Sequence, residues 1–205
     1  MTASWFIDNI VEIFGAVTGI AYVILEIRRN ILLWPLGIIT SAVYMYVFGQ
    51  TGFYANMGLQ GYYLAISVYG WYRWRSQPET ADAGAGSDVK RIDYATAAWY
   101  VLATAAIWAG LWIVLDRATG SPVPVWDGLI ASLSVVATWM LTRKYLEQWY
   151  VWIVANAIAV VVYISSGLYP TAVLFFVYFV MAIIGVIKWR QGVSRQYQSA
   201  VGSIE

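Results

Sequence analysis

The residues best suited to chemistry lie in one short segment, Trp149-Tyr-Val-Trp152-Ile-Val-Ala-Asn156. Trp149 and Trp152 are three residues apart, and Trp152 and Asn156 are four apart, so a helix places all three on one stripe. Indole faces stack on flat rings and attract cations, and the amide supplies both a donor and an acceptor. The spacing predicts a binding site for a planar ligand, including a cationic one such as a pyridinium. The structural alternative is that Trp149 belongs to an interfacial aromatic belt and Asn156 bonds neighbouring helices.

A second group of polar and aromatic residues lies earlier in the chain. Gln60 and Tyr63 are three residues apart, and Asn56 is four residues before Gln60, so one helical stripe holds them. We expect this stripe to supply a partner surface to the tryptophan segment. Trp34 and Thr40 are further candidates on the preceding apolar segment, although a membrane threonine often bonds only its own backbone.

The composition decides the environment in which these residues act. Of the 205 residues, 61% are hydrophobic and 11% are charged, whereas soluble domains carry about 25% charged residues. Lipid must therefore solvate much of the chain, which argues against soluble enzymes, nucleic-acid binders and disordered proteins. The chain contains no His and no Cys and no phosphate-binding Gly-Lys-Ser/Thr loop, so we expect no cofactor, no metal and no enzymatic activity.

Long uncharged runs predict the membrane helices. Residues 30–72 and 148–187 contain no Asp, Glu, Lys or Arg, and each run is long enough for two crossings with a turn between them. With the shorter apolar segments, the sequence predicts an all-α integral membrane protein with seven transmembrane helices, at about 10–26, 32–48, 54–74, 94–115, 127–143, 148–166 and 170–188.

The basic residues orient these helices. Alternate connections hold 11 Lys and Arg on one side and only Arg117 on the other. By the positive-inside rule, the N-terminus lies outside and the C-terminus in the cytoplasm. The first ten residues contain Asp8 and no basic residue, so we expect no cleaved signal peptide.

The two halves of the chain are similar at an offset of 118, which aligns Trp34 with Trp152 and Trp71 with Trp189. Two three-helix repeats joined by one connector helix would have the same orientation, a 3+1+3 parallel-repeat arrangement like that of SWEET transporters. The predicted organisation is a first repeat (1–74), a cytoplasmic linker (75–93), a connector helix (94–117), a second repeat (118–190) and a cytoplasmic tail (191–205).

Several of these segments resemble the PnuC family of vitamin transporters. The resemblance is carried by Trp149-x-x-Trp152-x-x-x-Asn156, by Thr142–Gln148 before it, and by Trp126-Asp127, Tyr54-Ala55, Gln60 and Tyr69-Gly70-Trp71-Tyr72. It implies import of nicotinamide riboside, thiamine or riboflavin by facilitated diffusion, a homotrimer, and a cytoplasmic kinase that traps the substrate. The implied substrate-binding residues are Trp149, Trp152, Asn156, Gln60, Trp34, Thr40, Tyr63 and Tyr163. Gln148 departs from the family, where Asn is common.

Together these patterns predict an inner-membrane uniporter for nicotinamide riboside, surrounded by membrane lipid and without a nucleic-acid partner. No carboxylate lies near the centre of a predicted span, as expected without ion coupling, and Glu12 lies near an outer end. A thiamine or riboflavin carrier of the same family is the alternative, followed by a sugar carrier or a non-transporting scaffold.

Overall fold

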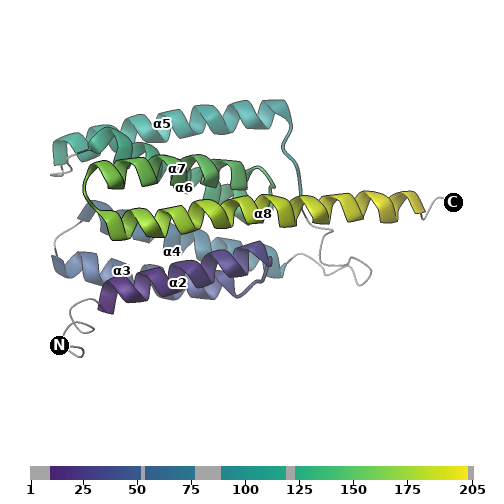
Figure 1. Cartoon of the computed structure of the whole chain (residues 1–205), viewed down its shortest axis with the longest axis horizontal. Coiled ribbons are helices and arrows are strands. Elements are labelled where there is room, and N and C mark those ends of the chain that lie inside the picture. The colour runs from purple at the N-terminus through teal and green to yellow at the C-terminus, as the bar shows by residue number, and fades with distance from the viewer. Residues whose placement is uncertain (1–9, 52–53, 77–88, 119–122, 203–205) are drawn as a thin grey trace. The chain divides into compact units, whose positions relative to one another are not determined.

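The computed structural model describes residues 10–51, 54–76, 89–118 and 123–202. Most of the predicted linker and the N-terminal residues used in the signal-peptide argument lie outside this range. The described residues form seven helices and, outside them, one isolated parallel β-bridge between Lys90 and Tyr145 (Figure 1). The predicted all-α class and the seven helices are confirmed.

The chain divides into two compact units, Met1–Tyr72 and Arg73–Glu205. The helices of the N-terminal unit are α2 (Ile10–Ile27), α3 (Leu33–Thr51) and α4 (Tyr54–Arg75), the last residues of α4 belonging to the second unit; those of the C-terminal unit are α5 (Tyr94–Ala118), α6 (Pro124–Thr142), α7 (Gln148–Ser165) and α8 (Tyr169–Gly202).

Several helix ends differ from the sequence prediction by three residues or more, and two of the differences have a plain physical cause. The α6 helix begins at Pro124 rather than near residue 127, because proline is favoured in the first helical turn, where its missing N–H costs nothing. The α8 helix continues to Gly202, whereas the sequence suggested a helix end near residue 188 and a loose tail. Beyond the apolar span, residues 188–202 contain no proline, and most are compatible with a helix.

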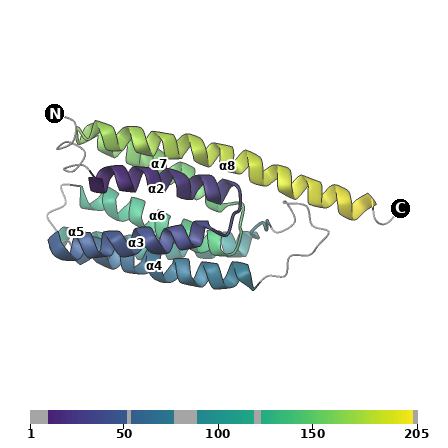
Figure 2. The ribbon, with the colours of Figure 1, turned by 90° about the horizontal axis from the view of Figure 1, so that it is seen from below.

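In the C-terminal unit, α7 packs against both α6 and α8 (Figure 2). The α5 helix packs against α6. Gly128 allows the close approach of α5 and α6, since a Cβ there would stand 3.2 Å from the backbone nitrogen of Trp112. The indole of Trp108 donates a 2.9 Å hydrogen bond to the carbonyl of Val125. This contact fixes the start of α6 against α5.

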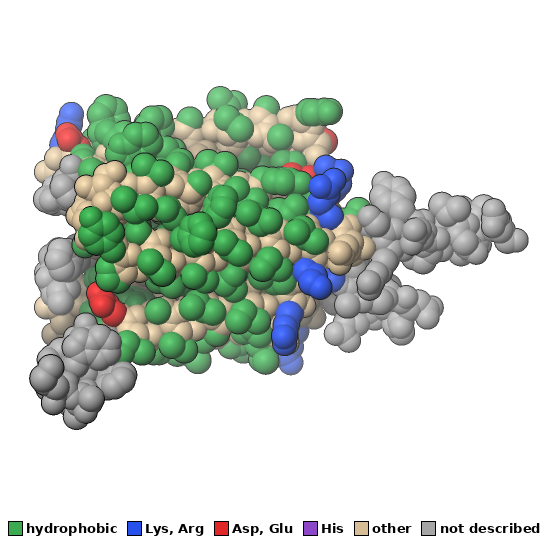
Figure 3. Space-filling view, viewed as in Figure 1, with side chains coloured by type: hydrophobic (Ala, Val, Ile, Leu, Met, Phe, Trp, Pro, Cys, Tyr) green, Lys and Arg blue, Asp and Glu red, His purple; other side chains and the backbone are tan. Residues whose placement is uncertain are grey.

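Hydrophobic side chains cover the middles of the helices, whereas Lys and Arg lie near helix ends (Figure 3). Five described helices are long and apolar enough to cross a membrane: α2, α5, α6, α7 and α8. The α3 and α4 helices are not among the five, because Tyr, Trp, Gly and amide residues replace many of the aliphatic ones.

The two units repeat each other at an offset of 115 residues. Helix starts Leu33 and Tyr54 of the first unit correspond to Gln148 and Tyr169 of the second. The connecting loops match as well: Arg29 has a φ of 53° and Lys144 a φ of 58°. Their backbone hydrogen bonds also agree, because Trp34 N–H donates to Ile31 C=O and Trp149 N–H donates to Leu146 C=O, at 3.1 and 3.2 Å.

The offset of 118 predicted from the sequence is therefore wrong by three residues. Trp34 corresponds to Trp149, not to Trp152, and Gly37 corresponds to Trp152. The error has a physical origin, because residues three apart lie on nearly the same face of a helix. An alignment based on tryptophan alone therefore paired Trp34 with Trp152, which lies one helical turn beyond its true counterpart Trp149.

Candidate substrate-binding site

Trp149, at the start of α7, is a packing residue in this structure. Its side chain is 1% exposed, and a Cβ added to Gly185 of α8 would stand 2.5 Å from the indole ring atoms. The ring also meets Trp189 edge-on, with centroids 5.6 Å apart and an angle of 84°. One face of Trp149 is thus covered by α8. The structure gives this indole less freedom to flank a ligand than its position in the sequence suggested.

Trp152 and Asn156 lie one and two turns further along α7. Asn156 is 4% exposed, which is unusual for a neutral amide unless it faces a polar path or a partner. The indole Nε1 of Trp152 is buried and has no hydrogen-bond partner among the described residues. Trp152 and Asn156 therefore supply the groups predicted from the sequence, an indole ring with a buried N–H and a buried amide.

Trp34 occupies the corresponding packing position in the N-terminal unit. It is fully buried at the start of α3, and a Cβ on Gly70 of α4 would stand 2.5 Å from its ring. Thr40 is half-buried on the same helix, next to Ser41, which is buried. Trp34 consequently holds α3 against α4 in the way Trp149 holds α7 against α8.

The remaining predicted residues are half-buried. Gln60 and Tyr63 lie on α4, where Tyr63 contacts Tyr62 edge-on at a centroid distance of 5.5 Å. Tyr163 lies near the end of α7, with its ring 5.1 Å from that of Phe175 on α8. The structure thus brings Trp149, Trp152, Asn156 and Tyr163 together on α7, and places Trp34, Thr40, Gln60 and Tyr63 on two adjacent helices of the N-terminal unit.

The entry to α7 is fixed by the segment that precedes α5. Lys90 N–H donates to Lys144 C=O at 3.0 Å, and Leu146 N–H donates to Lys90 C=O at 2.9 Å. The Glu147 carboxylate accepts hydrogen bonds from Ile92 N–H at 3.2 Å and from Arg91 Nε at 3.3 Å. These contacts hold the first turn of the helix that carries Trp149, Trp152 and Asn156.

The family model described as "Nicotinamide mononucleotide transporter" matches residues 9–191. The chain belongs to this family. Family membership confirms the prediction of a transporter rather than an enzyme, and together with the PnuC relatives below it confirms the predicted resemblance to the PnuC family. Together with the apolar helices, membership makes the chain a multi-pass membrane protein.

Curated relatives in this transporter family are similar over most of the chain. The nicotinamide riboside transporter PnuC of Escherichia coli (strain K12) is 25% identical, over 87% of this chain and 84% of the relative. PnuC of Neisseria mucosa is 26% identical, over 92% of this chain and 74% of the relative. The riboflavin/roseoflavin transporter RibM of Streptomyces davaonensis is 24% identical, over 87% of this chain and 83% of the relative.

A solved structure described as the vitamin B3 transporter PnuC has the same fold. Its TM-score is 0.72 at 24% identity, with 95% of this chain and 87% of that chain covered. The match covers nearly the whole chain, so the two proteins share one helical fold.

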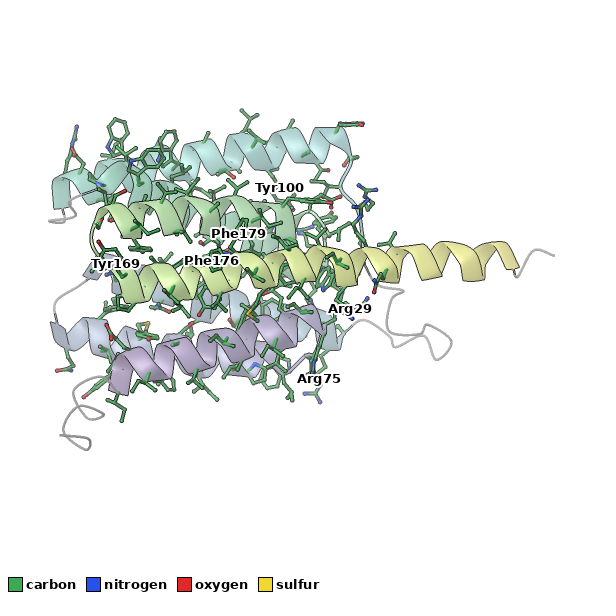
Figure 4. All side chains as sticks on the ribbon, in the orientation of Figure 1. Arg29, Arg75, Tyr100, Tyr169, Phe176 and Phe179 are labelled. Carbon is green, nitrogen blue, oxygen red and sulfur yellow. The ribbon has the colours of Figure 1, made fainter. Side chains whose placement is uncertain are left out.

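Aromatic residues of this transporter also lie away from the α7 stripe, that is, away from the face of α7 that carries Trp152 and Asn156. Figure 4 shows Tyr169, Phe176 and Phe179 along α8, with Tyr169 at its start. Phe176 and Phe179 stack at 6.4 Å, and Tyr169 is 64% exposed. The ring of Tyr100 on α5 meets that of Tyr145 edge-on, with centroids 6.3 Å apart. Tyr145 is also the residue that pairs with Lys90 in the β-bridge. The exposed rings suit a lipid-facing or interfacial surface.

Two buried polar residues were missed by the sequence reasoning. Gln148 is fully buried, and both polar atoms of its side chain lack a hydrogen-bond partner among the described residues. Its distance of four residues from Trp152 was the signal that could have identified it. Glu26, at the end of α2, is 2% exposed, whereas Glu12, the carboxylate singled out from the sequence, is exposed.

A separate cavity of about 510 Å³ lies in the C-terminal unit, between the start of α6 and the end of α7. Its lining is mainly apolar and comprises Val123, Trp126, Ala157, Ile158, Val161, Val162, Ser165 and Ser166. None of the eight predicted substrate-binding residues is among them. By helical spacing, the α7 residues of this lining lie mainly on the side opposite Asn156, so the cavity is not the candidate site.

Proposed function

We propose that this transporter takes up nicotinamide riboside across the inner membrane by facilitated diffusion. The observation that carries the proposal is that the half-buried Trp152 and the buried Asn156 lie one turn apart on α7, in a chain that belongs to a transporter family. A pyridinium ring stacked on Trp152 gains cation–π attraction of about 0.5–2 kcal/mol. That is a suitable strength for a carrier, which must release what it binds.

The charge of the candidate residues favours a riboside over its phosphate ester. All eight are neutral, and α7 contains no Lys or Arg between Gln148 and Ser165. A phosphate group bound inside a membrane protein, away from water, requires cationic partners, typically arginine. The names of the relatives in Escherichia coli and Neisseria mucosa support the same choice.

The proposed substrate-binding residues are Trp152 and Asn156 of the second repeat and Gln60, Tyr63 and Thr40 of the first, in a chain of seven crossings with a 3+1+3 arrangement. The N-terminus lies outside and the C-terminus in the cytoplasm, the protein is a homotrimer, and a cytoplasmic kinase traps the imported riboside as its phosphate. The matching loops at Arg29 and Lys144 support the duplication.

Binding is tested by titrating the purified protein with nicotinamide riboside, its mononucleotide, thiamine and riboflavin while following tryptophan fluorescence. We expect saturable binding of nicotinamide riboside alone at low concentration. The 12 tryptophans give a large background, so Trp152→Ala serves as the matched control and loses the signal change. Uptake into liposomes without an ion gradient then separates a uniporter from a scaffold that moves no solute.

Riboflavin is the second candidate, because RibM is 24% identical over most of the chain. Its isoalloxazine is also flat, but it is neutral and much larger than a pyridinium. Thiamine, a flat cation, remains the other alternative. Saturation by either vitamin without any by nicotinamide riboside would change the assigned substrate and leave the transporter family unaffected.

A further inference from the structure

The 115-residue repeat separates the buried residues of α7 into two groups. Trp149 and Gly185 recur in the first unit as Trp34 and Gly70, with the same close packing of indole on glycine. Residues that recur with the same contacts belong to the scaffold that both units share. Residues that differ between the units are free to carry a function that only one unit performs.

Three residues of α7 differ from their counterparts and share one stripe. Gln148, Trp152 and Asn156 are spaced by four, and Leu33, Gly37 and Ser41 occupy the same positions of α3. The first unit is therefore apolar or small at each point where the second unit carries a large hydrogen-bonding side chain. The stripe extends over eight residues, or about 12 Å of helix.

Gln148 is the member whose burial is hardest to explain by folding alone. It is 0% exposed, as is its counterpart Leu33, so a leucine fills the equivalent position in the other unit. Both Nε2 and Oε1 of Gln148 lack a hydrogen-bond partner among the described residues. A buried amide without partners destabilises a fold, so its presence calls for a group that pairs with it.

We propose that Gln148 is a specificity-determining residue of the substrate site and pairs with the carboxamide of the bound ligand. This inference rests on the proposed function. A primary carboxamide presents a donor and an acceptor on one edge, and the Gln148 amide offers the complementary acceptor and donor. With the pyridinium on Trp152, the carboxamide reaches Gln148 one turn away, and the ribose lies toward Asn156 on the other side.

The test compares two ligands in three proteins. Nicotinamide riboside and the pyridinium riboside without the carboxamide are titrated into the parent, Gln148→Leu and Gln148→Met. We expect the parent to prefer nicotinamide riboside at least tenfold and both variants to bind the two ligands alike. We also expect the ligand-free thermal midpoint of the variants to equal or exceed that of the parent, because an unpaired buried amide has been removed.

Each other outcome is decisive. If Gln148→Leu or Gln148→Met keeps the parental preference, or if the parent binds the two ligands equally, Gln148 does not contact the carboxamide. If both variants lower the ligand-free thermal midpoint and keep the preference, the amide has a structural role only. If the parent binds neither riboside, the proposed function itself fails, independently of Gln148.

Discussion

Trp149 lies flat on Gly185, so closely that a methyl group on this glycine would stand 2.5 Å from the indole ring. The same relationship holds between Trp34 and Gly70. In both units, a tryptophan at the start of one helix packs against a glycine of the next helix along the chain. The hairpins α3–α4 and α7–α8 therefore depend on the absence of a side chain at one position each.

Gly185→Ala tests this packing directly. The added methyl group forces the indole of Trp149 away from α8, and overpacking of this kind costs about 1–3 kcal/mol. We expect a lower thermal midpoint, measured in detergent by a fluorescence melting curve. Gly110→Ala is the matched control, because a Cβ there meets nothing within 4 Å. An equal midpoint for the two variants would contradict the close contact.

Asn156→Ser and Trp149→Phe separate ligand binding from packing. Asn156→Ser installs the residue that the first unit carries as Ser41, and we expect a tenfold or greater rise in the Kd for nicotinamide riboside, about 1.4 kcal/mol. Trp149→Phe leaves part of its pocket empty, so we expect lower stability with a nearly unchanged Kd. Isothermal titration with a parallel melting curve measures both. If Trp149→Phe loses binding and Asn156→Ser keeps it, the assignment of packing to Trp149 and of ligand binding to Trp152 and Asn156 is wrong.

The contacts of Glu147 predict unequal effects for its two partners. Arg91 is 66% exposed at its side chain, and exposed ion pairs contribute about 0–1 kcal/mol, so we expect Arg91→Ala to change the thermal midpoint little. Glu147→Ala also leaves Ile92 N–H without its acceptor at 3.2 Å and should lower the midpoint further. Glu147→Gln, which keeps an acceptor for Ile92, should lie between them. A larger loss for Arg91→Ala than for Glu147→Ala would show that the ion pair dominates.

Asp93 gives a pH-dependent contribution outside the membrane. It precedes α5, and the hydrogen bond from Thr96 to its carboxylate lowers its pKa below the ordinary value of 3.8. A lowered folded-state pKa means that the stabilisation is complete above pH 3.8 and is lost as the pH falls through the folded pKa. We expect Asp93→Ala to have a lower thermal midpoint than the parent at pH 7, with the difference shrinking toward pH 3. If the difference in thermal midpoint between the parent and Asp93→Ala grows as the pH falls, the pKa of Asp93 is not lowered by folding.

The membrane topology is accessible to labelling because the chain contains no Cys. Single variants Arg28→Cys and Arg143→Cys should react with a membrane-impermeant maleimide only after the cells are opened. Arg117→Cys should react in intact cells. Labelling of Arg28→Cys and Arg117→Cys from the same side would contradict the proposed orientation and the count of seven crossings.

The helices were predictable because charged residues are rare inside lipid. A long uncharged run therefore crosses the membrane as helices, and turn residues mark where one helix ends and the next begins. Gln148 and Tyr94 were both predicted as helix starts, and both are. The end of α8 was not predictable from apolarity, since a polar helix continues past the span without a change in backbone geometry.

The chemistry of the stripe was readable from the spacing of Trp152 and Asn156, but the division of roles was not. Trp149 and Trp152 are the same residue type one turn apart, and only the glycine opposite Trp149 distinguishes them. That glycine lies 36 residues away in sequence, so no local pattern reveals it. The correct repeat offset likewise depended on backbone hydrogen bonds in the loops rather than on residue identity.

Arg29 and Lys144 have left-handed backbone conformations in the loops that precede α3 and α7. A non-glycine residue in this conformation costs roughly 1–2 kcal/mol, which glycine would avoid. In the proposed orientation, these same positions supply cations that retain the loops in the cytoplasm while the helices enter the bilayer. Each loop thus keeps a residue in a strained backbone conformation and carries a positive charge that directs insertion during synthesis, so the positions that strain the folded chain are also those that orient it.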